Sequence, residues 1–180
     1  MDPQPAFWLG ETIGFWIQTG AYSLSALFAG GALIYNAKQV KLLRKANDSN
    51  ERLARARATI DVVLHENGNS DFQQCLKQFG VLREGKTEFT QYACGDLTTH
   101  AEINDVVLPV LNNYEFMATG IRTKAFDEEI YRRMKRSTVI RDWHLLSGYV
   151  AQLRHKENRP AIFIEFEAIA KKWESEPPNR

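Results

Sequence analysis

Residues 12–37 read TIGFWIQTGAYSLSALFAGGALIYNA and contain no charged side chain. These 26 positions exceed the roughly 20 mostly apolar residues that an α-helix needs to cross the hydrocarbon core of a bilayer. Residues 13–35 are the most apolar part, and Phe15, Trp16 and Tyr35 lie near its two ends. Trp and Tyr side chains prefer the depth of the lipid headgroups. The sequence therefore predicts a transmembrane helix over residues 13–35.

The charges on the two sides of this stretch predict its orientation. Residues 1–12 contain two acidic and no basic side chains. The residues that follow the stretch are rich in positive charge, namely Lys38, Lys41, Arg44 and Lys45. The positive-inside rule then places residues 1–12 outside the inner membrane as a short extracytoplasmic N-terminus, with everything after Lys38 in the cytoplasm. The same four side chains are expected to touch anionic lipid, within a basic juxtamembrane linker or stalk over residues 36–50.

Two other interpretations of the apolar stretch stay open, a cleaved secretory signal peptide and the buried helix of a soluble protein. A signal peptide carries its positive charge before the apolar run, and its apolar run is shorter. Here the positive charge follows the run, which favours an uncleaved membrane anchor.

Two series of residues predict self-association. Small side chains spaced four apart let two helices approach closely in lipid, and here they are Ala21, Ser25 and Ala29. A second series has the alternating steps of a coiled-coil seam and would act as a stalk, namely Leu53, Ala56, Ile60 and Val63. Both series predict a homo-oligomer.

Residues 51–174 are predicted to form a helical domain. Apolar residues recur there at helical spacing, and no segment alternates polar and apolar at every second position. The fold class is therefore all-α, an N-terminal transmembrane helix followed by a cytoplasmic bundle of five or six short helices. Four poor helix formers at residues 47–50 predict a break or bend, and Pro109 predicts a kink or a split in its helix. Residues 175–180 are expected to be a disordered tail.

Charge argues against a nucleic-acid partner. From Glu51 onward the chain contains 19 basic and 19 acidic residues, without the basic excess typical of duplex binding. A local basic stretch could still suggest a groove for single strands, namely Arg132, Arg133, Lys135, Arg136 and Arg141. A solvated helix face, or one that faces anionic lipid, is the favoured interpretation of these side chains.

No motif for catalysis, metal or cofactor binding is present. The histidines and the two cysteines lack the spacing of a zinc site, and the chain has no P-loop, dinucleotide fingerprint or nucleophile elbow. We therefore predict no catalytic residue, no metal ligand and no cofactor. Asp127 and its two acidic neighbours are expected to stabilise the first turn of a helix.

Glu115 is the one side chain that attracts a functional hypothesis. It lies between Tyr114 and Phe116 in an apolar helical stretch, where a half-buried carboxylate needs a cation or several donors. Arg122 and Arg154 are the candidate partners of a structural ion pair. The alternative is a functional carboxylate.

Short motifs in the C-terminal half resemble one known family. They are residues 111–122 (LNNYEFMATGIR), Asp127-Glu128, Trp143, Pro160 and residues 166–173 (FEAIAKKW). In this order they resemble the small membrane-anchored bacterial family catalogued as domain of unknown function 4760. The resemblance covers about residues 53–173. It implies an N-terminal anchor on a cytoplasmic helical domain, and it implies no activity.

The sequence is best interpreted as a single-pass inner-membrane protein that acts by protein–protein association, either with itself or with a partner protein docked at the membrane. Two alternatives stay open. One is a membrane-perturbing effector whose cytoplasmic domain senses a signal. The other is a helical enzyme that uses Glu115 with His144 or Arg154.

Overall fold

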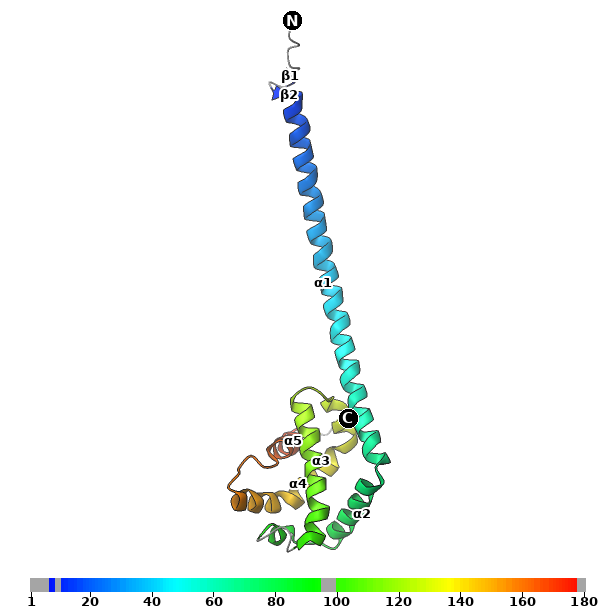
Figure 1. The fold of residues 1–180 in the computed structure, drawn as a ribbon, viewed down its shortest axis with the longest axis vertical. Coiled ribbons are helices and arrows are strands. Elements are labelled where there is room, and N and C mark those ends of the chain that lie inside the picture. The colour runs from blue at the N-terminus through cyan, green and yellow to red at the C-terminus, as the bar shows by residue number, and fades with distance from the viewer. Residues whose placement is uncertain (1–6, 9–10, 95–99, 178–180) are drawn as a thin grey trace. The chain divides into compact units, whose positions relative to one another are not determined.

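The computed structural model describes residues 7–8, 11–94 and 100–177 (Figure 1). Most of the N-terminal segment expected outside the membrane, and the last three residues of the expected tail, lie outside the described residues. The chain forms two compact units, Met1–Glu51 and Arg52–Arg180. The described part of the chain is helical apart from its loops and one pair of two-residue strands, so the predicted all-α fold class is confirmed.

The first unit is dominated by the apolar part of helix α1. Strands β1 (Phe7–Trp8) and β2 (Glu11–Thr12) pair antiparallel, and α1 (Ile13–Gly68) begins directly after them. The Thr12 hydroxyl accepts a hydrogen bond from the Phe15 N–H at 3.4 Å, which caps the start of the helix. Among the described residues α1 is the one helix long and apolar enough to span a membrane. None of the residues in its most apolar part is buried. Leu27 and Phe28 are more than 70% exposed.

Helix α1 continues without interruption through residues 47–50, so the predicted break there was wrong. The Asn47 side-chain amide donates to the Glu51 carboxylate at 2.8 Å, one helical turn further on. Such pairs stabilise a helix by a few tenths of a kcal/mol. Helix propensity is a weak preference, and the stronger helix formers on both sides of the four residues outweigh it.

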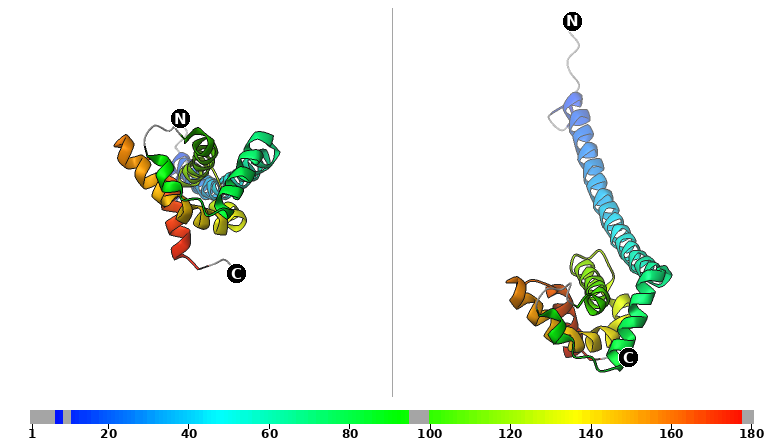
Figure 2. Two further views of the ribbon diagram at one scale, coloured as in Figure 1. Left: turned by 90° about the horizontal axis from the view of Figure 1, so that it is seen from below. Right: turned by 60° about the horizontal axis from the view of Figure 1, so that its bottom comes forward.

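The second unit is a helical bundle built by the end of α1 with α2 (Ser70–Glu84), the 3-10 helix η1 (Phe89–Ala93), α3 (Ala101–Arg122), α4 (Glu128–Glu157) and α5 (Ile164–Ser175). Helix α3 packs against both α2 and α5, and α4 packs against η1 and α5 (Figure 2). Large side chains fill the space between these helices and are less than 2% exposed, among them Phe79, Phe89, Tyr149, Phe166 and Trp173. Burial of such aromatic side chains is the main stabilising term of the bundle.

Two helix boundaries in the second unit can be traced to single residues. The Asp127 carboxylate accepts the Ile130 N–H at 3.0 Å and caps the start of α4, as its position in the sequence predicts. Helix α3 runs unbroken through Pro109, so the predicted split does not occur. Pro109 lies on the exposed side of α3, where its ring meets solvent.

Side chains from α4 hold the C-terminal end of α5. Arg136 donates from Nη2 to the carbonyl oxygens of Trp173 at 2.6 Å and Glu176 at 2.7 Å, and Arg132 donates to the carbonyl of Pro177 at 2.8 Å. The last carbonyls of a helix have no partner within it and carry its negative dipole end. Two members of the basic stretch therefore point into the structure and satisfy these carbonyls, while the rest of the stretch includes the exposed Arg133.

We predict that Arg136→Leu lowers the free energy of unfolding by about 2 kcal/mol, since it leaves two partly buried carbonyls without their charged donor. Arg133→Leu on the same helix is the matched control. Its exposed ion pair with Glu129 is worth at most about 0.5 kcal/mol. Urea unfolding of the detergent-solubilised full chain, followed by circular dichroism, measures both values. Equal losses in the two variants would contradict the role of Arg136.

Candidate functional site

A cleft of about 750 Å³ opens in the second unit where α1, α3, α4 and α5 meet. The end of α3, the loop after it and one side of α5 supply its apolar lining: Ala118, Ile121, Phe126, Ala168 and Ile169. Arg52 and Arg55 of α1 line another part of it. Pockets of roughly 300–1,000 Å³ are the size that binds small organic molecules.

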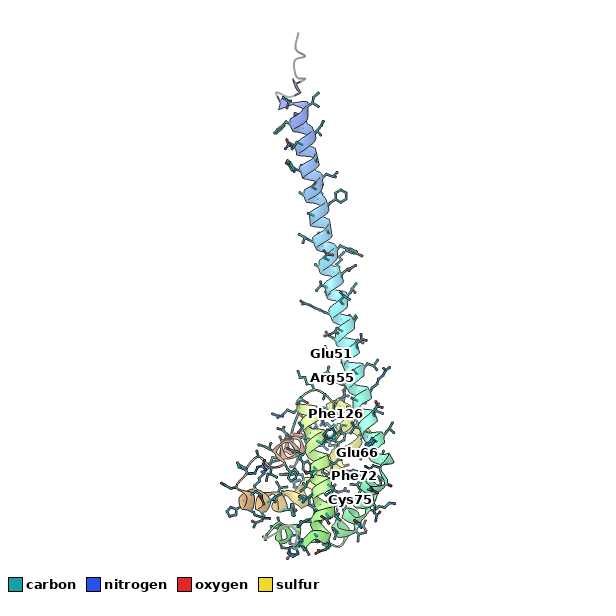
Figure 3. The ribbon with its side chains drawn as sticks, in the orientation of Figure 1. Glu51, Arg55, Glu66, Phe72, Cys75 and Phe126 are labelled. Atoms are coloured by element: carbon teal, nitrogen blue, oxygen red, sulfur yellow. The ribbon has the colours of Figure 1, made fainter. Side chains whose placement is uncertain are left out.

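Gly120 determines how the apolar wall of the cleft is built. A β-carbon at this position would lie 2.1 Å from the ring of Phe126, so only glycine lets that ring pack on α3. The Gly120 carbonyl accepts the N–H groups of Ala125 and Phe126 at 2.8 and 3.0 Å, which closes the turn after α3. The Phe126 ring also contacts Phe116 at a centroid distance of 5.6 Å (Figure 3 labels Phe126). The wall is therefore fixed by the backbone.

The acidic side chains of the cleft already have partners. Glu165 pairs with Arg122 at 2.8 Å, and Glu128 pairs with Lys172 at 2.6 Å. Glu129 pairs with Arg133, and Asp127 caps α4. The cleft also contains the cations of Arg52 and Lys124, which have no ion-pair partner among the described residues. The unneutralised charge of the cleft is therefore positive.

Glu128 links the start of α4 to α5, two elements that line the cleft. Its carboxylate accepts hydrogen bonds from Lys172 Nζ at 2.6 Å and from the indole N–H of Trp173 at 3.0 Å. Partial burial alone would raise the pKa of Glu128, but these two hydrogen bonds and the charges of Lys172 and Arg132 together hold the pKa below its ordinary value. Glu128 is therefore charged at neutral pH, and it fixes α5 to the start of α4.

Glu115 has different partners from those expected. Its carboxylate accepts the backbone N–H groups of Phe166 at 2.8 Å and Glu165 at 3.3 Å, in the first turn of α5. Arg122 bonds instead to Glu165, and Arg154 bonds to Glu167 at 2.6 Å. The three predicted residues thus all act on the start of α5, but they do not form an ion pair with one another. Backbone donors in place of a cation satisfy the half-buried carboxylate.

The four residues of the predicted stalk seam differ in how far they are buried. Val63 is only 3% exposed because it packs into the core of its own domain, so it cannot belong to a seam between chains. Leu53 and Ile60 are 49% and 44% exposed, and Ala56 is half-buried. The buried side chains of α1 are Thr59, Val63 and Glu66, and Glu66 accepts a hydrogen bond from Asn113 at 2.9 Å. This face of α1 therefore packs against the other helices of its own domain.

The predicted transmembrane residues Ala21, Ser25 and Ala29 are all exposed in the first unit, as are Lys38, Lys41, Arg44 and Lys45. The Ser25 hydroxyl donates to the Ala21 carbonyl at 2.8 Å, within its own helix. Its hydrogen-bonding capacity is thus met without a second chain.

Within the described part of the chain, no group of three or more His, Cys, Asp or Glu side chains lies close enough together to hold a metal ion. Cys75 and Cys94 are free thiols. His144 bonds to Glu174 at 2.8 Å near the end of α5, and His144 is more than half exposed. The arrangement of Glu115 as a helix cap gives no support to the enzyme alternative.

A buried carboxylate network escaped the sequence analysis. Asp142 is 2% exposed and accepts hydrogen bonds from the Tyr114 hydroxyl at 2.7 Å and from Arg141 at 2.9 Å, with Arg83 at 3.4 Å. Burial and the nearby Asp142 carboxylate raise the pKa of Tyr114. The network joins α2, α3 and α4. The periodicity of the sequence does not show that Asp142 is buried, and its partners Tyr114 and Arg83 lie 28 and 59 residues away.

These features define an all-α domain that carries one candidate membrane helix and a cleft with a positive rim. Residues 23–173 match the family model described as "Domain of unknown function (DUF4760)", so the chain belongs to that family and the predicted resemblance is confirmed. The match begins within the apolar stretch of α1, earlier than the resemblance did. No curated protein and no solved structure matches the chain.

We predict that Glu115→Ala lowers the free energy of unfolding by about 2 kcal/mol, because two backbone N–H groups lose their charged acceptor. Glu115→Gln keeps a neutral acceptor oxygen and is expected to lose only about 1 kcal/mol. Asp105→Asn, an exposed carboxylate on the same helix, is the control and should change stability by less than about 0.5 kcal/mol. A Glu115→Gln protein as stable as the unmodified chain would contradict the capping role.

Proposed function

We propose that this protein is a single-pass inner-membrane protein whose helical domain lies in the cytoplasm and which works by association with other protein chains. The observation that carries the proposal is the exposed, uncharged stretch of α1, followed directly by four basic side chains. Apolar surface of this extent is costly in water and favourable in lipid. The positive charge at one end supports the orientation.

Self-association is supported by two exposed features of α1. The small residues Ala21, Ser25 and Ala29 share one helical face, and a second helix could approach there without breaking the hydrogen bond of Ser25. Leu53 and Ile60 offer exposed apolar side chains in the second unit. With Val63 committed to its own domain, the transmembrane face is the stronger part of the proposal.

Orientation can be tested with two reporters fused separately to the C-terminus, a fluorescent protein and a phosphatase. We expect the fluorescent protein to be active in the cytoplasm and the phosphatase to be inactive there. Replacing four residues with Gln, namely Lys38, Lys41, Arg44 and Lys45, should reduce the cytoplasmic fraction, because the charge asymmetry is lost. The control removes four exposed charges from the domain, at Lys77, Lys86, Lys156 and Arg159. An active phosphatase on the unmodified chain would contradict the proposed orientation.

Assembly can be tested by light scattering of the full chain in a mild detergent. We expect the double variant Ser25→Ile and Ala29→Ile to weaken the oligomer about tenfold or more, since bulky side chains separate the helices. The matched control is Ser23→Ile with Leu27→Ile, on the opposite face of the same helix, where the Ser23 hydroxyl also bonds within the helix at 2.9 Å. A mass unaltered by the first pair but lowered by the second would exclude the predicted face.

A further inference from the structure

We propose that the cleft of the second unit is a binding site for a small organic anion with an apolar body. The apolar part would lie on Ile121, Phe126 and Ile169, and the anionic group would lie against Arg52 and Lys124. This site is additional to the proposed association function and does not depend on it.

The apolar wall of the cleft is held in place by the backbone of α3 and of the turn that follows it. Phe126 is fixed by Gly120, and the turn that follows α3 also positions Lys124, whose N–H donates to the Ile121 carbonyl at 3.0 Å. Lys124 has a φ of 61°, in the left-handed region, so this rim position is set by the turn. A preformed wall costs a ligand little conformational entropy.

Helix α1 is anchored at the edge of the cleft. Thr59 is 0% exposed, and its hydroxyl accepts the N–H of Asp127 at 2.7 Å, at the start of α4. Arg52 and Arg55 lie seven and four residues before Thr59, so helical spacing puts them on the same side of α1. Both arginines line the cleft.

The charge of the cleft favours an anionic ligand. Each acidic side chain that lines the cleft is engaged by a cation or a helix N-terminus within the domain, whereas Arg52 and Lys124 have no ion-pair partner among the described residues. A ligand with a carboxylate, sulfonate or phosphate group would neutralise this excess. Its binding should weaken with salt, because the rim is exposed.

The size of the cleft favours a small molecule. Its volume of about 750 Å³ lies within the roughly 300–1,000 Å³ of pockets that bind small organic molecules. A small molecule is therefore the proposed occupant, and the experiment distinguishes it from an acidic peptide.

The test uses the full chain in nanodiscs of zwitterionic lipid, with empty nanodiscs subtracted. The probe is anilinonaphthalene sulfonate, an aromatic anion, and its neutral counterpart is phenylnaphthylamine. We expect saturable binding of the sulfonate, about tenfold or more tighter than that of the neutral probe. The double variant Arg52→Glu and Lys124→Glu should abolish this preference and leave binding of the neutral probe unchanged.

A second variant blocks the apolar part of the site. Ala168 is exposed and lines the cleft, so Ala168→Trp should weaken both probes about tenfold or more without disturbing the core. The matched controls are Ala151→Trp on α4, and Arg57→Glu with Lys77→Glu, all at exposed positions outside the cleft. Circular dichroism and the detergent-state mass verify folding and assembly for every variant.

Three results would overturn the proposal. They are no binding above that of empty nanodiscs, equal losses in the control variants, or binding of an acidic peptide that depends on Arg52 and Lys124 while the sulfonate does not bind. Loss of probe binding in the cleft variants with an unchanged oligomer supports the site and leaves the association function standing. A monomer that still binds the sulfonate in the cleft would overturn self-association alone.

Discussion

The domain depends on the charged side chains that hold the two ends of α5. A helix of 12 residues is marginal by itself in water. Glu115 from α3 accepts the N–H groups at its start, and Arg136 from α4 donates to the carbonyls at its end. Between these ends, Phe166 and Trp173 are buried against the neighbouring helices. Helices α3 and α4 thus both hold α5, and α5 supplies one side of the cleft.

Ion pairs between helices accord with the equal numbers of acidic and basic side chains in the domain. Acidic and basic side chains pair across helices, as Glu128 does with Lys172 and Arg154 with Glu167. Arginines that a sequence analysis assigns to solvent or lipid, such as Arg132 and Arg136, are directed at backbone carbonyls. In the cleft, Arg52 and Lys124 are cations that have no ion-pair partner among the described residues.

Sequence reasoning succeeded where the signal lies within one helix and failed where it lies between helices. The apolar stretch, the helical spacing of apolar residues in the domain and the helix start at Asp127 are short-range patterns, and the structure has each of them. The partners of Glu115 are about 50 residues away, and the cleft unites four helices. No local pattern encodes such distances. The error at residues 47–50 is different in kind, since a weak local preference was overruled by its neighbours.

The position of α5 in the chain determines when the bundle can fold during synthesis. Residues 13–35 leave the ribosome before the residues of the second unit, and α5 is the last of the described helices. Domains generally fold as units during synthesis. Until α5 is made, the Glu115 carboxylate and the Arg136 guanidinium lack their backbone partners, and the ring of Tyr114 lacks Phe166, on which it stacks at 4.6 Å. The bundle can therefore close only after α5 has been made, when the apolar stretch of α1 has already left the ribosome.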